Sequence, residues 1–167
     1  MSLGAGLILV LAACGGGGGG ATDEADSSAA ATSKDVTFEA AKLGGGTLSS
    51  ASFKGKDTVL WFWAPWCTIC RGEAPDVTSV AAAFDGEIEV IGVAGRGEEP
   101  AMEDFVSDTD TGALTHVVDD SGSIWSDYGV AAQPSFAFID DDGSVEVHIG
   151  ALGEAALTKQ MDALVAS

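Results

Sequence analysis

The stretch from Trp61 to Pro75, WFWAPWCTICRGEAP, contains two of the three cysteines of this 167-residue chain. Cys67 and Cys70 have a spacing that zinc knuckles, structural disulfides and redox-active dithiols share. The run before them, Thr58 to Ala64, is continuously apolar and has the length of a strand buried on both faces of a sheet. The residues after it, 65 to about 84, have helical spacing of their apolar positions. The cysteine pair therefore lies where a buried strand turns into a helix.

A zinc site and a structural disulfide are the weaker explanations of this pair. A closed zinc site needs four ligands, and the further candidates are His116 and His148, each alone in a strand-like run. A disulfide that closes a loop of four residues stabilises the fold by only about 2 kcal/mol, less than a bridge across a long loop. We therefore expect no metal at the cysteines.

A redox dithiol suits the position best. The N-terminus of a helix presents unpaired N–H groups and a partial positive charge, which together stabilise a thiolate at Cys67. Cys70 follows three residues later, on the same helix face and within bonding reach. We expect the sulfur of Cys67 to be exposed at the turn and that of Cys70 to be buried. This asymmetry predicts an attacking thiol and a resolving thiol.

The rest of the chain predicts an α/β fold. We expect strands at 36–40, 58–64, 87–94, 116–118, 135–140 and 145–150, and helices at 65–84, 100–108, 124–128 and 154–165. The early alternation of strands and helices predicts right-handed crossovers and parallel pairing. The Asp-Gly turn between the last two strands predicts an antiparallel hairpin. These elements form a mixed central sheet flanked by helices on both faces.

The N-terminal part of the sequence differs from the rest. Cys14 follows a short apolar stretch that ends in small residues, as the core of a signal peptide does. The ending LAAC resembles a bacterial lipobox, which implies a signal peptide at 1–13 and lipid attachment at Cys14. Residues 14–35, with six consecutive glycines, have no apolar face to bury, so we expect a disordered tether. The folded domain is expected at 36–167.

The charge balance limits the partners. The chain has 26 acidic and 7 basic residues, a net charge of −19. Such a surface repels nucleic acid and anionic lipid headgroups. No apolar run is long enough to span a membrane in the mature protein. We therefore expect no nucleic-acid partner, and membrane association only through the lipid anchor.

Two motifs resemble the thioredoxin superfamily. The first is WCTIC after an apolar strand, with Pro75 five residues beyond Cys70. The second is VAAQPSF at 130–136, which is similar to the cis-proline loop that faces the dithiol in this superfamily. The resemblance covers roughly 36–167. It implies a thioredoxin fold and a cis peptide bond before Pro134.

The glutamate in WCxxCxxExP, Glu73, resembles the extracytoplasmic TlpA/ResA/DsbE branch of the superfamily, as do an N-terminal extension and the inserted helix at 100–108. The wider pattern resembles the secreted DsbE/DsbF-like proteins of actinobacteria. Thioredoxin has a buried aspartate at the position of Trp61, so Glu73 is the acidic residue that replaces it, or else a solvated helix residue. The resemblance implies catalytic positions at Cys67, Cys70, Glu73 and Pro134, and substrate-facing positions at Trp66 and Gln133.

The resemblance implies an enzyme, an extracytoplasmic thiol–disulfide oxidoreductase, either lipid-anchored or secreted. Its substrates would be thiols and disulfides of exported proteins, its electrons would pass to a membrane redox partner, and it would act as a monomer without a cofactor. A copper carrier that uses the two thiolates and a histidine is an alternative, although copper-carrying relatives use CxxxC. A peroxidase is disfavoured because the Thr-containing pocket pattern before the helix is absent.

Within the enzyme interpretation, we expect net oxidation of substrate thiols. A cysteine at a helix N-terminus, with Arg71 nearby, is expected to have a lowered pKa, which makes the disulfide more oxidising. The uncharged pair Thr68-Ile69 does not oppose this, whereas the carboxylate of Glu73 would raise the thiol pKa. The alternative is a thiol reductase of the TlpA/ResA type, as in cytochrome c maturation.

Overall fold

The computed structural model describes residues 36–167, so the expected signal peptide, Cys14 and the tether lie outside the described residues. None of the helices in this part of the chain is long and apolar enough to cross a membrane. The elements are β1 (Glu39–Ala41), β2 (Thr47–Ser49), a 3₁₀ helix (Ser50–Phe53), β3 (Asp57–Trp63), α1 (Thr68–Ala83), β4 (Ile88–Gly95), α2 (Glu99–Asp108), β5 (Thr115–Asp119), α3 (Ser123–Asp127), β6 (Ser135–Ile139), β7 (Val145–Ile149) and α4 (Glu154–Val165).

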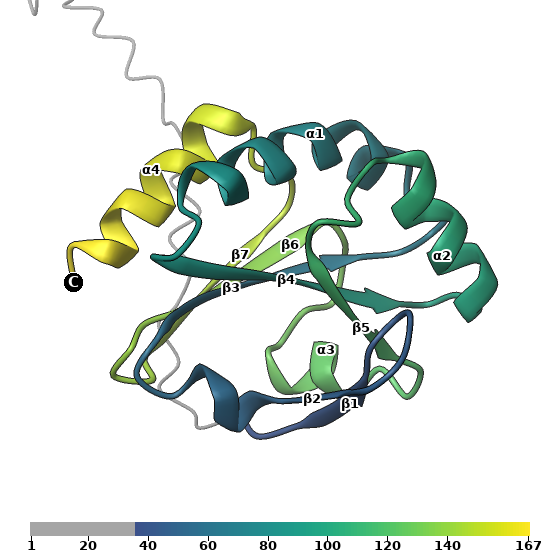
Figure 1. Cartoon of the computed structure of the whole chain (residues 1–167), viewed down its shortest axis with the longest axis horizontal. Coiled ribbons are helices and arrows are strands. Elements are labelled where there is room, and N and C mark those ends of the chain that lie inside the picture. Colours follow the sequence, from purple (N-terminus) through teal and green to yellow (C-terminus); the bar gives the residue numbers. More distant parts are fainter. Residues whose placement is uncertain (1–35) are drawn as a thin grey trace, which may run out of the picture.

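A five-stranded mixed sheet forms the centre of the fold, in the order β5-β4-β3-β6-β7 (Figure 1). β3 is the middle strand. It runs parallel to β4 and antiparallel to β6, and β4 in turn runs parallel to β5. The hairpin of β6 and β7 adds the antiparallel edge. The predicted mixed sheet is thus confirmed, and the strand that leads to the cysteines lies at its centre.

Alternate residues of β3 build two separate cores. Trp61 and Trp63 face the layer of α1, α2 and α4, whereas Leu60 and Phe62 face the layer that contains α3. Figure 1 shows the three longer helices on one side of the sheet and α3 with the β1–β2 hairpin on the other. The prediction of helices on both faces is confirmed. The second face is completed by the hairpin, because α3 has only five residues.

Two sequence-based expectations need correction. The helix expected from Pro65 begins at Thr68, because Cys67 has an extended backbone and caps the helix. The strand expected at 36–40 is β1, and its antiparallel partner β2 was not predicted. The turn between the two strands contains three glycines with positive φ, and β2 has only one apolar residue, so no alternating pattern marks it.

A buried polar pair supports the α1 side of the sheet. The indole Nε1–H of Trp63 donates to Nδ1 of His116 over 3.2 Å, so the histidine proton lies on Nε2, which donates to the carbonyl of Thr111 over 3.0 Å. Burial lowers the pKa of His116. A methyl group at Gly92 would lie 2.1 Å from this imidazole, so glycine is needed where the ring passes β4. His116 is therefore a buried strand residue whose two ring nitrogens are both engaged.

Candidate active site

The dithiol is held at the junction of β3 and α1. Cys67 is the N-cap residue of α1, and its sulfur accepts a hydrogen bond from the backbone N–H of Cys70 over 3.0 Å. A disulfide joins the two residues, whose Cα atoms are 5.3 Å apart. N-cap side chains usually satisfy the unpaired N–H groups of a first helical turn with oxygen, and here sulfur takes that place. The arrangement stabilises negative charge on Cys67 when the disulfide is reduced.

The expected exposure of the Cys67 sulfur at the turn is wrong for this disulfide form. Cys67 is 5% exposed and Cys70 is fully buried, because the capping sulfur faces the helix and its partner rather than the solvent. The direction of the asymmetry remains as expected, since only Cys67 retains any contact with solvent. An incoming thiolate therefore meets Cys67 first.

Two exposed apolar side chains flank the dithiol. Trp66 is 61% exposed and Ile69 is 62% exposed, the highest values among large apolar residues in the described part of the chain. The indole Nε1–H of Trp66 donates to the carbonyl of Arg96 over 2.7 Å. The ring of Trp66 is therefore exposed and yet held in place. Together these two residues surround the dithiol with an apolar surface in an otherwise acidic protein.

The proline loop lies at the same edge of the sheet as the dithiol. The Gln133–Pro134 peptide bond is cis, as the sequence predicts. β6 begins at Ser135, which pairs with Phe62 next to the end of β3, so the loop before β6 and the turn after β3 leave the sheet side by side. The carbonyl of Pro134 accepts a hydrogen bond from the backbone N–H of Gly150. The fold thus places the two predicted motifs together.

Glu73 is a buried carboxyl group and not a solvated helix residue. Its Oε2 accepts a hydrogen bond from the indole of Trp61 over 3.1 Å, and its Oε1 accepts one from the backbone N–H of Leu152. Burial outweighs these hydrogen bonds and raises the pKa of Glu73 from 4.5 to about 7, with a smaller contribution from the charge of Asp76. The indole at position 61 carries no titrating proton of its own, but it orients a carboxyl group that does.

Glu73 and Cys70 both lie on the buried face of α1, one helical turn apart. A carboxyl group with a pKa near 7 exchanges its proton readily at neutral pH. The buried thiol therefore shares its helix face with a carboxyl group that titrates near neutral pH.

Both arginines of the chain contact the segment around the dithiol. Arg71 donates from Nη2 to the carbonyl of Pro65 and pairs through Nη1 with Asp108 over 3.1 Å. Its charge is therefore partly neutralised, which weakens the effect expected on the cysteines. Arg96 was not singled out in the sequence, although it lies between two glycines directly after a buried strand. That Gly-Arg-Gly pattern was the available signal.

These features define the class of protein. A CxxC disulfide capping the helix after the central strand, with a cis-proline loop beside it, is the site of a thioredoxin-fold dithiol protein. The chain belongs to the AhpC/TSA family, whose profile matches residues 32–148.

Individual relatives agree with this assignment. The chain is 42% identical over 107 residues to the soluble secreted antigen MPT53 of Mycobacterium tuberculosis, a match that covers 64% of this chain and 61% of that protein. The chain thus spans less than two thirds of that relative's length. The structure of MTB DsbF in mixed oxidised and reduced forms has a TM-score of 0.74 and 43% identity, covering 76% of this chain and 94% of that one.

A secreted Mycobacterium tuberculosis disulfide oxidoreductase, homologous to Escherichia coli DsbE, has a TM-score of 0.71 and 38% identity, covering 76% of this chain and 96% of that one. The resemblance seen in the sequence and the thioredoxin fold are both confirmed.

Glu73→Gln should change the pH dependence of stability. The carboxyl group has a higher pKa in the folded state than in the unfolded chain, so its contribution is fully present below pH 4.5 and is lost as the pH rises through about 7. The glutamine side chain does not titrate, so the variant does not lose stability from this position as the pH rises. The difference in unfolding free energy between wild type and variant should therefore move in favour of the variant by up to about 1.4 kcal/mol per pH unit in this window. Urea denaturation between pH 4.5 and 8 measures it.

The amide of the variant presents an NH₂ group to a site with two donors, so a lower overall stability is expected at every pH. The readout is the slope of the difference with pH. Glu103→Gln makes the same chemical change at an exposed position on α2 and serves as the control. Equal slopes for the Glu73 variant and wild type would contradict the buried titration.

Proposed function

We propose that this protein is an extracytoplasmic thiol–disulfide oxidoreductase that acts on thiols and disulfides of exported proteins. The observation that carries the proposal is the Cys67–Cys70 disulfide at the N-cap of α1, beside the cis peptide bond of Pro134. Two relatives, a secreted antigen and a secreted disulfide oxidoreductase, support the location, and the second supports the activity.

The oxidation proceeds through two exchanges. A substrate thiolate attacks Sγ of Cys67, the Cys67–Cys70 bond breaks, and Cys70 leaves as a thiolate. A second substrate thiolate then attacks the substrate sulfur of the mixed disulfide and releases Cys67 as a thiolate held by the helix N-terminus. The substrate loses two electrons and two protons, and the dithiol gains the electrons. We propose that Glu73, on the same face of α1, passes a proton to Cys70. The reverse sequence reduces a substrate disulfide.

We propose oxidation as the net direction. The helix N-terminus and the N–H of Cys70 stabilise the thiolate of Cys67, which favours the reduced form of the protein and makes its disulfide oxidising. Thr68 and Ile69, between the cysteines, carry no charge. Reduction is the second candidate, and Glu73 favours it, because a carboxylate on the same helix face opposes a thiolate at Cys70.

The copper-carrier alternative would need a histidine with a free ring nitrogen, and His116 has none. Both ring nitrogens of His116 are engaged, one by Trp63 and the other by Thr111. Within residues 36–167, no group of three His, Cys, Asp or Glu residues is arranged to hold a metal ion. The geometry therefore favours disulfide exchange over metal carriage.

Trapping distinguishes the attacking cysteine from the resolving one. Cys70→Ser is expected to accumulate mixed disulfides with substrate proteins, because the Cys67 thiolate attacks and nothing resolves the product. Cys67→Ser should trap few or none, since Cys70 is fully buried. Non-reducing electrophoresis with mass spectrometry counts the adducts, and the double variant gives the background. Equal trapping by the two single variants would reject the asymmetry.

The reduction potential tests the direction. Equilibration with glutathione should give a value above the roughly −270 mV of thioredoxin, and the oxidised protein should promote refolding of a reduced, denatured substrate. A potential at or below that value, together with no refolding activity, would identify a reductase.

We further propose that the protein is held at the outer face of the cell membrane through a lipid on Cys14, that it works as a monomer, and that a membrane redox partner resets its dithiol. The support for the anchor is the LAAC sequence at residues 11–14. Mass spectrometry of the protein from its host should find residues 1–13 removed and Cys14 acylated, and Cys14→Ser should release it from membranes. An unmodified Cys14 with residues 1–13 still attached would refute the anchor.

A further inference from the structure

Arg96 lies in a tightly enclosed loop between β4 and α2. Its backbone has φ of 57°, in the left-handed region that non-glycine residues rarely adopt. A Cβ atom at Gly95 would lie 2.8 Å from the indole of Trp125, and one at Gly97 would lie 2.4 Å from the ring of Pro65. The loop is therefore wedged between α3 on one side and the turn before the dithiol on the other.

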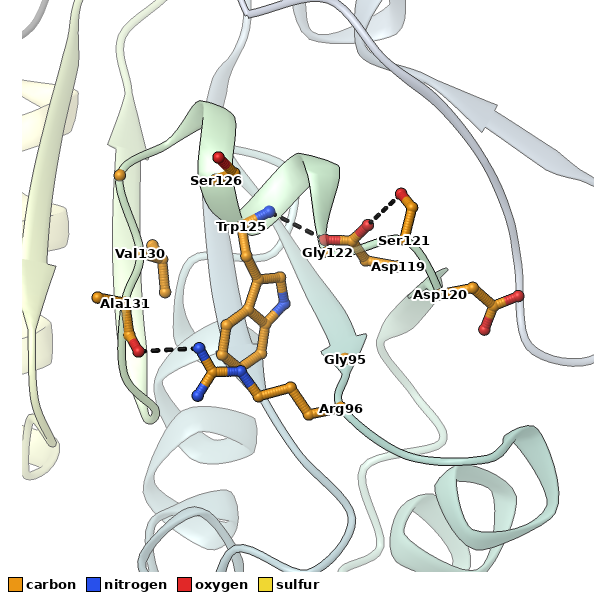
Figure 2. A pocket seen from close by; sticks show the side chains of 11 residues that line it. Gly95, Arg96, Asp119, Asp120, Ser121, Gly122, Trp125, Ser126, Val130 and Ala131 are labelled. Atoms are coloured by element: carbon orange, nitrogen blue, oxygen red, sulfur yellow. Dashed lines mark hydrogen bonds between the residues drawn. The ribbon is translucent and has the colours of Figure 1, made fainter.

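Arg96 makes contacts in both directions from this position. Its carbonyl accepts the hydrogen bond from Trp66 over 2.7 Å. Its guanidinium donates to the carbonyl of Ala131 over 2.8 Å and to Oε1 of Gln133 over 3.2 Å. The same group lies 4.7 Å from the ring centroid of Trp125. Figure 2 shows the guanidinium beside this indole and directed towards Ala131.

A cavity lies beside the residues that lead into the proline loop, so the contacts with Arg96 support this loop on that side. This cavity of about 510 Å³ is bordered by Arg96, Trp125, Gly129 and Ala131 among others, and Figure 2 shows Arg96, Trp125 and Ala131 around it. The segment before Gln133 therefore borders open space on this side. The two hydrogen bonds from Arg96 link it to the rest of the site.

The two hydrogen bonds to the proline loop use the shape of the guanidinium, whereas the contact with the ring of Trp125 uses its charge. Both acceptors are neutral, a backbone carbonyl and a side-chain amide. Within residues 36–167, Arg96 takes part in no ion pair, whereas Arg71 is paired with Asp108. A planar fork reaches two acceptors at once, and the single ammonium of lysine does not reproduce this geometry.

We propose that Arg96 is a positioning residue for the polypeptide substrate. It holds Trp66 through its carbonyl and Gln133 through its guanidinium, and so fixes both sides of the surface where a cysteine-containing segment meets Cys67. The inference rests on the proposed oxidoreductase function. Because the guanidinium bonds to the proline loop and not to either sulfur, it acts on substrate binding and leaves the chemistry of the dithiol unchanged.

Arg96→Lys keeps the positive charge but loses the planar guanidinium that reaches two acceptors at once. For a peptide of about ten residues with one central cysteine, we expect KM to rise about tenfold, because two hydrogen bonds that hold the loop are lost. The kcat value, the rate with dithiothreitol and the reduction potential should stay unchanged, since a small dithiol does not need the loop. Arg96→Gly removes the guanidinium and relieves the positive φ, so it should show the same rise in KM, and the relief should offset part of the stability that is lost with the hydrogen bonds.

The control is Lys54→Gln, which removes a positive charge at the opposite end of β3 and should leave all four quantities unchanged. Arg96→Lys combined with Gln133→Ala should raise KM by less than the product of the two single effects, because both changes break one shared contact.

An unchanged KM in both Arg96 variants, or an equal loss with the peptide and with dithiothreitol, would overturn the positioning role. So would a shifted reduction potential. If the wild type exchanges with dithiothreitol but with no cysteine peptide, the oxidoreductase function itself fails, and this inference fails with it. The two failures are therefore distinguished by the wild-type reaction.

Discussion

The hydrogen bond from the N–H of Cys70 to the sulfur of Cys67 is the interaction on which the site depends. It requires the backbone of Cys67 to be extended and that of Thr68 to be helical, so it sets the point at which β3 gives way to α1. β3 is the middle strand of the sheet, and its neighbours therefore bring their own ends to this point. β6 contributes the proline loop, and the end of β4 contributes Arg96. The ends of β3, β4 and β6 therefore meet near the sulfur of Cys67.

Two tryptophans on β3 orient polar side chains in the core beneath the dithiol. Trp61 donates to Glu73 and Trp63 donates to His116, so each indole places a titratable group on the α1 side of the sheet. Burial moves the two in opposite directions, raising the pKa of Glu73 to about 7 and lowering the pKa of His116. Both shifts favour the uncharged form. These shifts reduce the charge below the disulfide near neutral pH, and the helix end stabilises a thiolate of Cys67.

The parts of the structure that follow local patterns could be predicted from the sequence. The buried strand before the cysteines and the hairpin of β6 and β7 each follow from a short run of residues, and the cis bond before Pro134 follows from the resemblance of VAAQPSF to a known proline loop. The remaining features depend on contacts between distant segments. The burial of Glu73 requires Leu152, 79 residues away, and the role of Arg96 requires Trp66 and the proline loop. No periodicity marks such contacts, because one polar side chain has the same pattern whether it is buried or solvated.

The two arginines make the surroundings of the dithiol different from the rest of this acidic chain. The chain carries a net charge of −19, yet Arg71 and Arg96 both lie against the turn before Cys67. Each uses its guanidinium to hold a backbone carbonyl, that of Pro65 or that of Ala131. The reacting surface is therefore an apolar area around Trp66 and Ile69 within an acidic chain, and we propose that a substrate of the oxidoreductase docks there through shape and apolar contact.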